Sequence, residues 1–273
     1  MENNILVSII MSEYNTDEML LKESIRSMLE QTYKNFEFII VDDKGRNNLK
    51  EIVKSFNDER IKVVENEKNE GLVYSLNRAI EEANGKYLVR MDTDDFSYND
   101  RLKKQVDFME QHPEYAVVGT RVDYYDGVNV FAETKFCGEV TKEILSKGSS
   151  SITHPSVIMR KDVIKEVGCY QDYNRCEDYA LWIELILNGY RLYVMEDKLL
   201  RYHLSLSDYS KRKLSTRKGF FKLLREKYRK LNPSITKYYL LVCKTFIAGI
   251  VPYKIMAKYH EHKYEIKEWK YDS

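Results

Sequence analysis

The feature that most constrains the fold is an alternation, through the first half of the chain, of short apolar runs with segments of helical periodicity. We expect strands near 5–10, 36–41, 61–64 and 87–91, with amphipathic helices between them. Strands that alternate with helices form βαβ units and a mainly parallel sheet. The apolar runs lack polar alternation, as strands covered on both faces do. The sequence therefore predicts an α/β fold with a mainly parallel central sheet flanked by helices.

Local signals bound the predicted helices and extend the pattern. Asn15 stands three residues before Glu18, the spacing of a capping box, so we expect a helix to begin there. Asn84 and Gly85 end the third helix, as residues that tolerate left-handed backbone do. Further along, the residues predict extended chain over 122–134, a strand at 157–159 and a helix over 178–187. In such sheets ligands bind at the carboxyl ends of the strands, so we expect the functional residues there.

Composition excludes several classes of protein. Hydrophobic residues make up 43% and charged residues 32%, which suits a globular core rather than disorder. The four cysteines form no CxxC pair and no zinc framework, so we expect reduced thiols in the cytoplasm. The N-terminus lacks a basic segment, and no uninterrupted apolar run reaches about 18 residues. We therefore expect neither a signal peptide nor a membrane-spanning helix.

The strongest chemical signal is the acidic cluster Asp92-Thr93-Asp94-Asp95, directly after the run 87–91. In extended chain Asp92 and Asp94 share a face and Asp95 faces the other way. Carboxylates this close repel one another unless a cation neutralises them. Mg²⁺ and Mn²⁺ prefer oxygen ligands and often bridge to phosphates. A solvated acidic turn is the alternative, but the position at a strand end favours a metal site.

Other polar residues follow strands or open helices of the same predicted sheet. An acid after the second strand commonly bonds a ribose or a base, an aromatic ring can stack on a base, and helix N-terminal amides can face phosphate. Each is also ordinary loop chemistry when taken singly. The candidates are Asp42 and Asp43 after 36–41, Ser12 and Tyr14 after 5–10, and Asn69 and Gly71 at the start of the third helix.

A third acidic site is Glu177-Asp178, which opens the helix over 178–187. One of these carboxylates could act as a general base toward an alcohol. Alternatively, both acids simply favour a helix N-terminus, which would also keep Asp178 ionised near neutral pH. His154 and His203 could reach the same region, and His203 is a candidate ligand for a metal or a phosphate, although a lone histidine is more often structural.

Taken together and in order, these segments resemble the family 2 glycosyltransferases, which have the GT-A fold, and in particular those of bacterial surface polysaccharides. The resemblance implies a Rossmann-like GT-A catalytic domain over residues 1–207 and a helical tail over 208–273. The matching segments are Val7–Asn15, Ser27–Phe36, Ile40–Asp43, Asn69–Ala83, Asn84–Asp95, Arg101-Leu102, His154–Arg160 and Glu177–Glu184.

The resemblance also implies roles for the candidate residues. Lys44-Gly45-Arg46 and Glu13 depart from the usual family pattern beside the base site. Ser12, Tyr14 and Asp43 would hold the nucleobase and ribose with support from Asp42, and Asn69, Gly71 and Glu177 would complete the nucleotide-sugar site. Asp92 and Asp94 would approach the ribose and the metal, Asp95 would bind Mn²⁺ or Mg²⁺ on the diphosphate with Asp94 and His203, and Asp178 would be the catalytic base.

The implied activity is an inverting transfer from a nucleotide sugar, expected to be a UDP-sugar, to a glycan or lipid-linked acceptor. A sugar-phosphate nucleotidyltransferase would share the sheet and the acids, but the chain has no glycine-rich phosphate loop near its N-terminus. A dehydrogenase is disfavoured because Met11–Asn15 contains no glycine. A non-catalytic scaffold protein would be expected to have lost part of the acidic set.

The tail differs in composition from the rest of the chain. Lys211–Lys230 holds ten Lys or Arg residues and one acid, interleaved with Leu and Phe, and Tyr238–Met256 is apolar with two lysines. Such a segment is either a helical lid on the catalytic domain or a peripheral contact with the inner face of the cell membrane, which we favour. Nucleic acid is not an expected partner, because no recognition motif accompanies the charge.

Overall fold

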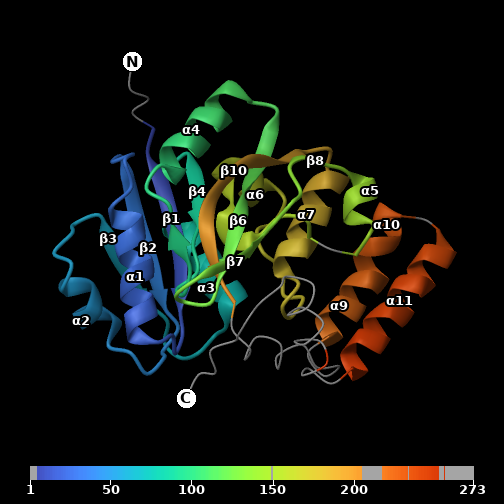
Figure 1. Ribbon diagram of the computed structural model, residues 1–273, viewed down its shortest axis with the longest axis horizontal. Coiled ribbons are helices and arrows are strands. Elements are labelled where there is room, and N and C mark those ends of the chain that lie inside the picture. The colour runs from blue at the N-terminus through green and yellow to red at the C-terminus, as the bar shows by residue number, and fades with distance from the viewer. Residues whose placement is uncertain (1–4, 149, 205–216, 233, 252–254, 256–273) are drawn as a thin grey trace.

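The structure is a computed structural model that describes residues 5–148, 150–204, 217–232, 234–251 and 255. A large twisted sheet crosses the molecule and carries helices on both faces (Figure 1). In the described part of the chain this sheet has ten strands, in the order β3-β2-β1-β4-β9-β6-β10-β5, with β7 beside β6 and β8 beside β10. The strands are β1 (Val7–Glu13), β2 (Phe36–Asp42), β3 (Ile61–Glu65), β4 (Tyr87–Arg90), β5 (Phe96–Ser97), β6 (Tyr115–Tyr125), β7 (Val130–Glu133), β8 (Gly138–Val140), β9 (Ile158–Arg160) and β10 (Arg191–His203).

The helices connect the strands and cover the sheet. Those before the tail are α1 (Glu18–Leu29), α2 (Leu49–Lys54), α3 (Leu72–Glu82), α4 (Arg101–Gln111), α5 (Lys142–Leu145), α6 (Lys161–Glu166) and α7 (Glu177–Leu187), with a 3-10 turn η1 (His154–Ser156). The tail has α9 (Lys218–Leu223), a π-helical turn η3 (Leu224–Tyr228), α10 (Arg229–Leu231) and α11 (Ile235–Ile250).

Strand direction brings several strand ends to one edge of the sheet. The four strands β3, β2, β1 and β4 run parallel to one another. Strand β9 is antiparallel to both β4 and β6, and β10 is parallel to β6. It follows that β6 and β10 run in the same direction as β4, so the carboxyl ends of all these strands meet at one edge. The predicted mainly parallel α/β sheet is confirmed; β9 is antiparallel to both of its neighbours, and the short strands β5, β7 and β8 also pair antiparallel.

The buried strands serve two cores because successive side chains point to opposite faces. On β1, Ile9 packs with α1 and α4, whereas Ile10 packs with α3 and α7. On β2, Phe38 and Ile40 join the first core and Ile39 joins the second. Near-continuous apolar runs are what this burial on both faces requires.

Two details differ from the sequence expectations. The first helix is capped by Asp17, whose side chain accepts hydrogen bonds from the amides of Met19 and Leu20. The expected cap, Asn15, has a positive φ of 59° and its side chain accepts the Arg46 amide at 2.8 Å. The second difference is the length of β6 and β10, which continue the sheet well beyond the predicted strands.

The described part of the tail packs on the part of the chain that precedes it. The Tyr228 hydroxyl donates to the Ser146 carbonyl at 2.6 Å, and Lys227 forms an ion pair with Glu184 on α7. Leu223 and Leu224 are buried in the same core as α7. The packed-lid arrangement is therefore present for residues 217–232, whereas residues 205–216 and 256–273 lie outside the described residues. The predicted boundary at residue 207 stays a prediction.

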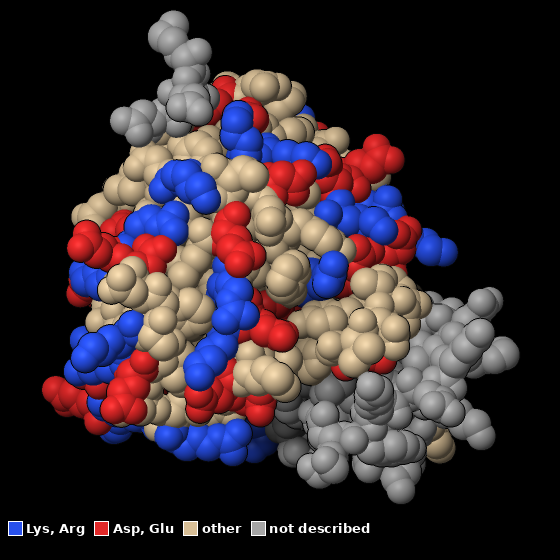
Figure 2. All heavy atoms as spheres, turned by 60° about the vertical axis from the view of Figure 1, so that its left-hand side comes forward, with Lys and Arg blue, Asp and Glu red and all other residues tan. Residues whose placement is uncertain are grey.

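Surface charge is mixed on the face that carries α1 and α2. Figure 2 shows blue and red side chains interspersed over this face, and ion pairs such as Lys62–Glu82 (2.6 Å) link them. Of the helices in the described residues, none is long and apolar enough to cross a lipid bilayer.

Candidate active site

The candidate residues converge at the shared edge of the sheet because β1, β2 and β4 run parallel and end near one another. Glu13 at the end of β1 lies opposite Asp42 of β2, and Ile10 lies opposite Arg90 of β4. The Met91 amide still donates to the Ile10 carbonyl at 3.1 Å, so the chain leaves the sheet only at Asp92. The acidic cluster therefore begins where the parallel sheet stops.

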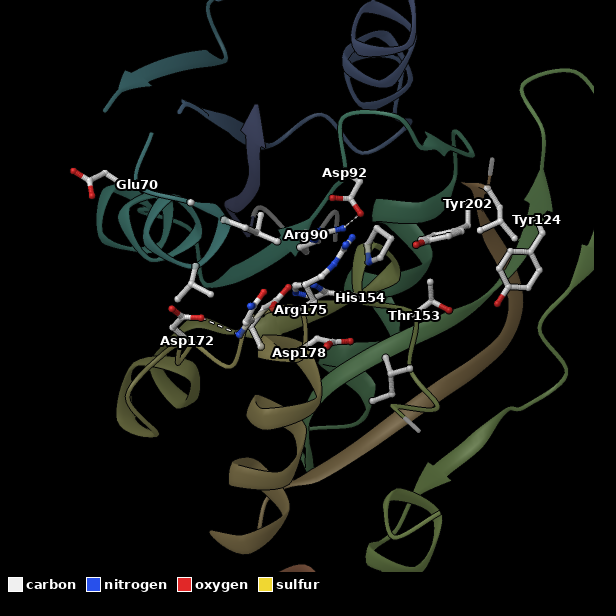
Figure 3. A pocket seen from close by; sticks show the side chains of 18 residues that line it. Glu70, Arg90, Asp92, Tyr124, Thr153, His154, Asp172, Arg175, Asp178 and Tyr202 are labelled. Atoms are coloured by element: carbon white, nitrogen blue, oxygen red, sulfur yellow. Dashed lines mark hydrogen bonds and ion pairs between the residues drawn. The ribbon is translucent and has the colours of Figure 1, made fainter. Parts of the chain in front are cut away.

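Arg90 organises the start of this cluster. It is a charged residue on a strand buried on both faces, with 3% of its surface exposed, and it forms an ion pair with Asp92 (Figure 3). Burial alone would lower the pKa of Arg90, but the Asp92 carboxylate raises it above its usual value. The Ser24 hydroxyl holds the Asp92 carbonyl at 2.6 Å. Asp92 is therefore fixed both through its backbone and through its side chain.

Asp94, Asp95 and His203 meet because β10 ends beside β6 at the same edge. The His203 amide donates to Asp95 Oδ1 at 2.8 Å, and His203 Nδ1 lies 3.6 Å from Asp94 Oδ2. The hydroxyl of Tyr125, whose ring lies edge-on to the His203 ring, donates to the Asp94 carbonyl at 3.1 Å. Chain segments about a hundred residues apart thus come together here. We call the group of Asp94, Asp95 and His203 the acidic corner.

This corner fits a hard divalent cation. Asp95 is 2% exposed, and its Oδ2 is buried with no hydrogen-bond partner. Burial raises the pKa of Asp95 well above its usual value, and the Asp92 and Asp94 carboxylates add to that shift. A buried oxygen without a partner is what a Mg²⁺ or Mn²⁺ ion would satisfy. Within the described residues, no three His, Cys, Asp or Glu side chains form a complete metal site, so a cation bound here would need further ligands from water or a phosphate.

Asp43 forms a tight internal network. Its Oδ1 accepts from Asn66 Nδ2 at 2.7 Å and from the Glu70 amide at 2.8 Å, and its Oδ2 accepts from the Gly71 amide at 2.9 Å. The amides of Glu70 and Gly71 therefore face Asp43 rather than a ligand. Gly71 has a φ of 89°, a conformation that favours glycine, and it lets the chain turn into α3. Asp42 instead accepts the Lys44 amide at 2.8 Å.

The remaining predicted nucleotide contacts lie at or near the same edge. Ser12 pairs with Val41 and is half-buried, while Tyr14 is 51% exposed just beyond β1. Asn69 is exposed and does not line the main cleft. The base and ribose roles of these residues stay predictions.

One cleft of about 950 Å³ lies beside this edge, within the usual size of a ligand site of about 300–1,000 Å³. Figure 3 shows Glu70 at one end, Tyr124 at the other, and Asp92 and Asp178 on opposite walls between them. Of the predicted residues it brings together Gly71, Asp92, His154, Glu177 and Asp178.

Asp178 has the properties of a general base. Burial, followed by the neighbouring Glu177 carboxylate, raises the pKa of Asp178 to about 6. The pKa stays below 7, so the Asp178 carboxylate is still largely ionised at pH 7. The Ser150 hydroxyl lies beside this carboxylate and lowers its pKa, while it donates to the Ile152 carbonyl at 2.6 Å and accepts the Trp182 indole N–H at 3.0 Å. The carboxylate is thus oriented by groups packed behind it.

His154 is a buried imidazole that lines the same cleft. Its Nε2 lies 2.8 Å from the Tyr170 hydroxyl, and its ring lies edge-on to Trp182. Burial, and then the charge of Arg90, lowers the pKa of His154 well below its usual value. The imidazole is therefore neutral at pH 7, and it lines the cleft as a hydrogen-bonding group.

Sequence reasoning missed Arg90 and Asn66. Arg90 could have been found as the single charge inside the apolar run Tyr87–Met91. Asn66, which is 1% exposed and donates to both Asp43 and Ser75, carried no sequence signal that separated it from the exposed Asn69.

Comparison with known proteins agrees with this arrangement. The family model described as "Glycosyl transferase family 2" matches residues 8–168. EpsE of Bacillus subtilis (strain 168), provisionally assigned as a glycosyltransferase, is 31% identical over 263 residues, which cover 94% of each chain.

Two solved structures share the fold. TarS 1-349 of S. aureus in complex with UDP has a TM-score of 0.62 and 24% identity, covering 83% of this chain and 68% of that one. The mannosyltransferase PcManGT of Pyrobaculum calidifontis, in complex with GDP-Man and Mn²⁺, has a TM-score of 0.64 and 17% identity, covering 96% and 81%. The predicted GT-A fold is confirmed.

Proposed function

The chain belongs to glycosyltransferase family 2, and on that premise we propose that it transfers a sugar from a nucleotide-sugar donor to a hydroxyl of a saccharide acceptor, with inversion at the anomeric carbon. The observation that carries this proposal is that Asp178, a carboxylate with a raised pKa of about 6, shares one cleft with Asp92 of the acidic cluster. A direct displacement requires a base near the group that holds the leaving diphosphate, and Asp92 begins the acidic cluster that would serve the diphosphate.

The reaction forms one bond while it breaks another. The acceptor oxygen bonds to the anomeric carbon, the bond from that carbon to the diphosphate oxygen breaks, and the diphosphate leaves with the electron pair. The hydroxyl proton passes to the Asp178 carboxylate. Attack from the face opposite the leaving group inverts the configuration, so an α-linked donor gives a β-linked product.

The acidic corner serves the donor diphosphate. Asp92, Asp94 and Asp95 would repel that diphosphate if nothing neutralised them. Asp95 and Asp94, with His203 beside them, would hold a Mn²⁺ or Mg²⁺ ion, which when bound neutralises charge on the leaving diphosphate. The partnerless Asp95 Oδ2 supports this role.

We further propose a UDP-sugar as donor. The Ser12 and Asp43 positions, as the family uses them, and the UDP complex of TarS support it. The GDP-Man complex of PcManGT is the reason to test other nucleotides directly.

We also propose a membrane-linked acceptor from surface-polysaccharide synthesis, with the tail as a peripheral membrane contact. Helix α11 supports the contact, because Lys237 and Lys244 line the groove against α5 beside an exposed apolar face. Basic residues next to exposed apolar ones suit an anionic lipid surface. The exposed residues of that face are Ile235, Leu240, Phe246, Ile247 and Ile250, each at least 49% exposed.

Two measurements test the proposal. Calorimetric titration with UDP, GDP and dTDP in Mn²⁺ is expected to show that UDP binds most tightly. A panel of nucleotide sugars is expected to release nucleoside diphosphate, and more so with acceptor present. If instead pyrophosphate is released from UTP and a sugar 1-phosphate, the protein is a nucleotidyltransferase; if no nucleotide binds, a scaffold role replaces catalysis.

A further inference from the structure

A second hollow opens beside the catalytic cleft, and no role is yet assigned to it. We call it the β7 groove; it is lined by Tyr124 and by residues 131–136 and 150–153, and its volume is about 710 Å³. It lies there because β7 pairs with the end of β6, with Ala132 opposite Tyr124. Its size falls within the range of about 300–1,000 Å³ typical of ligand sites.

The β7 groove is continuous with the catalytic cleft. Tyr124, Ile152 and Thr153 line both. Figure 3 shows Tyr124 and Thr153 at the end of the cleft that lies away from Glu70, so the β7 groove extends the cleft away from the α3 end. Ser150, whose hydroxyl lies beside the Asp178 carboxylate, also lines the groove. A molecule in the groove therefore begins next to the base.

We propose that the β7 groove binds the acceptor as a saccharide chain whose terminal hydroxyl reaches Asp178. This inference rests on the proposed glycosyl transfer. It assigns a site to the second substrate of that reaction, the saccharide acceptor. A transferase acting by direct displacement must hold two substrates at once, and the two adjoining hollows offer one site for each.

The lining of the groove matches a sugar ring. A pyranose has an apolar C–H face and a rim of hydroxyl groups, so it binds where aromatic faces stand among polar groups. Phe131 and Tyr124 lie nearly parallel, with an angle of 18° between rings whose centroids are 6.4 Å apart, and Phe136 adds a third ring. Thr134 and Ser151 supply hydroxyl groups in the same groove.

The charge of the groove also suits a saccharide. Glu133 is neutralised by Arg121 at 2.5 Å and by Lys198 at 2.8 Å. Lys135 is exposed at the rim and makes no ion pair within the described part of the chain. The net cationic rim accepts neutral sugars and those bearing a uronic acid.

Transfer kinetics test the proposal through Phe131. We expect Phe131→Ala to raise the KM for the acceptor about tenfold, equivalent to about 1.4 kcal/mol, while the donor KM and the acceptor-free hydrolysis of the donor stay unchanged. Phe131→Tyr keeps the ring and should keep the parental acceptor KM. Val130→Ala is the matched control, because Val130 is a 51% exposed residue of β7 that does not line the groove.

Binding without donor separates this inference from the proposed function. Saturation-transfer NMR with a panel of neutral and uronic-acid-containing tetrasaccharides should show binding by the parent and by Val130→Ala, and loss in Phe131→Ala at an unchanged melting temperature. If saccharide binding depends on Phe131 but the protein transfers no sugar, the groove assignment stands and the proposed transferase function is wrong. Active transfer with an acceptor KM within twofold of the parent in Phe131→Ala, or no tetrasaccharide binding, overturns the groove assignment.

Discussion

Replacing Asp178 by asparagine is the sharpest test of the chemistry. Asp178→Asn keeps the size of the side chain and its contact with Ser150 but removes the group that accepts the proton. Loss of a positioned general base commonly costs about 10²–10⁴-fold in rate, which corresponds to about 3–5 kcal/mol in the barrier at about 1.36 kcal/mol per tenfold. Donor binding should change little, because Asp178 is not among the residues proposed to hold the nucleotide or the metal.

The pH dependence gives an independent signature of the same group. With a pKa of about 6, the Asp178 carboxylate is about nine-tenths ionised at pH 7 and about one-tenth ionised at pH 5. Protonation removes the base, so transfer at subsaturating acceptor should fall about tenfold as the pH falls from 7 to 5. The residual activity of Asp178→Asn should lack this step.

Asp172→Asn is the control, because Asp172 is an exposed carboxylate that lines the same cleft. It accepts a hydrogen bond from the Asn174 amide at 2.9 Å, and asparagine can keep that bond. Initial rates of transfer, donor affinity by calorimetry and the pH profile should be measured for all three proteins. Near-parental transfer by Asp178→Asn, or an unchanged fall in activity at acid pH in that variant, would refute the assignment of Asp178 as the base. Glu177 or the neutral His154 would then be the next candidate.

Three further outcomes follow from the structure. Excess chelator should abolish transfer, and Asp95→Asn should raise the Mn²⁺ concentration for half-maximal activity at least about tenfold; full activity in chelator contradicts the metal site. Gly219→Ala should lower the free energy of unfolding in urea by about 1–3 kcal/mol, because the added Cβ would lie 1.5 Å from the Tyr173 carbonyl oxygen. An unchanged unfolding midpoint would show that α9 does not pack against Tyr173. Lys237→Gln combined with Lys244→Gln should weaken co-sedimentation with anionic vesicles at low salt; equal sedimentation with neutral vesicles, insensitive to salt, would argue against the membrane contact.

The parallel half of the fold was predictable because its signals are local. A strand such as Phe36–Asp42, buried on both faces, must be apolar throughout, and a helix such as Leu72–Glu82 shows its buried stripe in the spacing of its residues. Strand β10 gave no such signal. Its register against β6 shifts between Met195 and Lys198, and the polar residues at this irregularity interrupt any regular alternation.

The site was predictable only in part, for a related reason. Asp92 and Asp178 could be found because each stands at the boundary of a recognisable element. Asp95 accepts a hydrogen bond from the backbone amide of His203, which lies more than a hundred residues later in the chain. This contact depends on the order of strands in the sheet, and no local sequence pattern indicates that order. Likewise only tertiary packing decides that Asn66 is buried against Asp43 while Asn69 is exposed.

The contact between the tail and α7 has a practical consequence for protein engineering. Gly219 lies against the Tyr173 carbonyl oxygen, Phe220 stacks on Tyr179, and the Tyr173 hydroxyl donates to Glu226 at 3.2 Å. These residues flank the start of the helix that carries Asp178. A chimaera that joins the first 207 residues to a relative's C-terminal segment would therefore replace the residues that pack beside the start of the helix that carries Asp178. Exchange of α7 and residues 217–232 as one block would preserve that support.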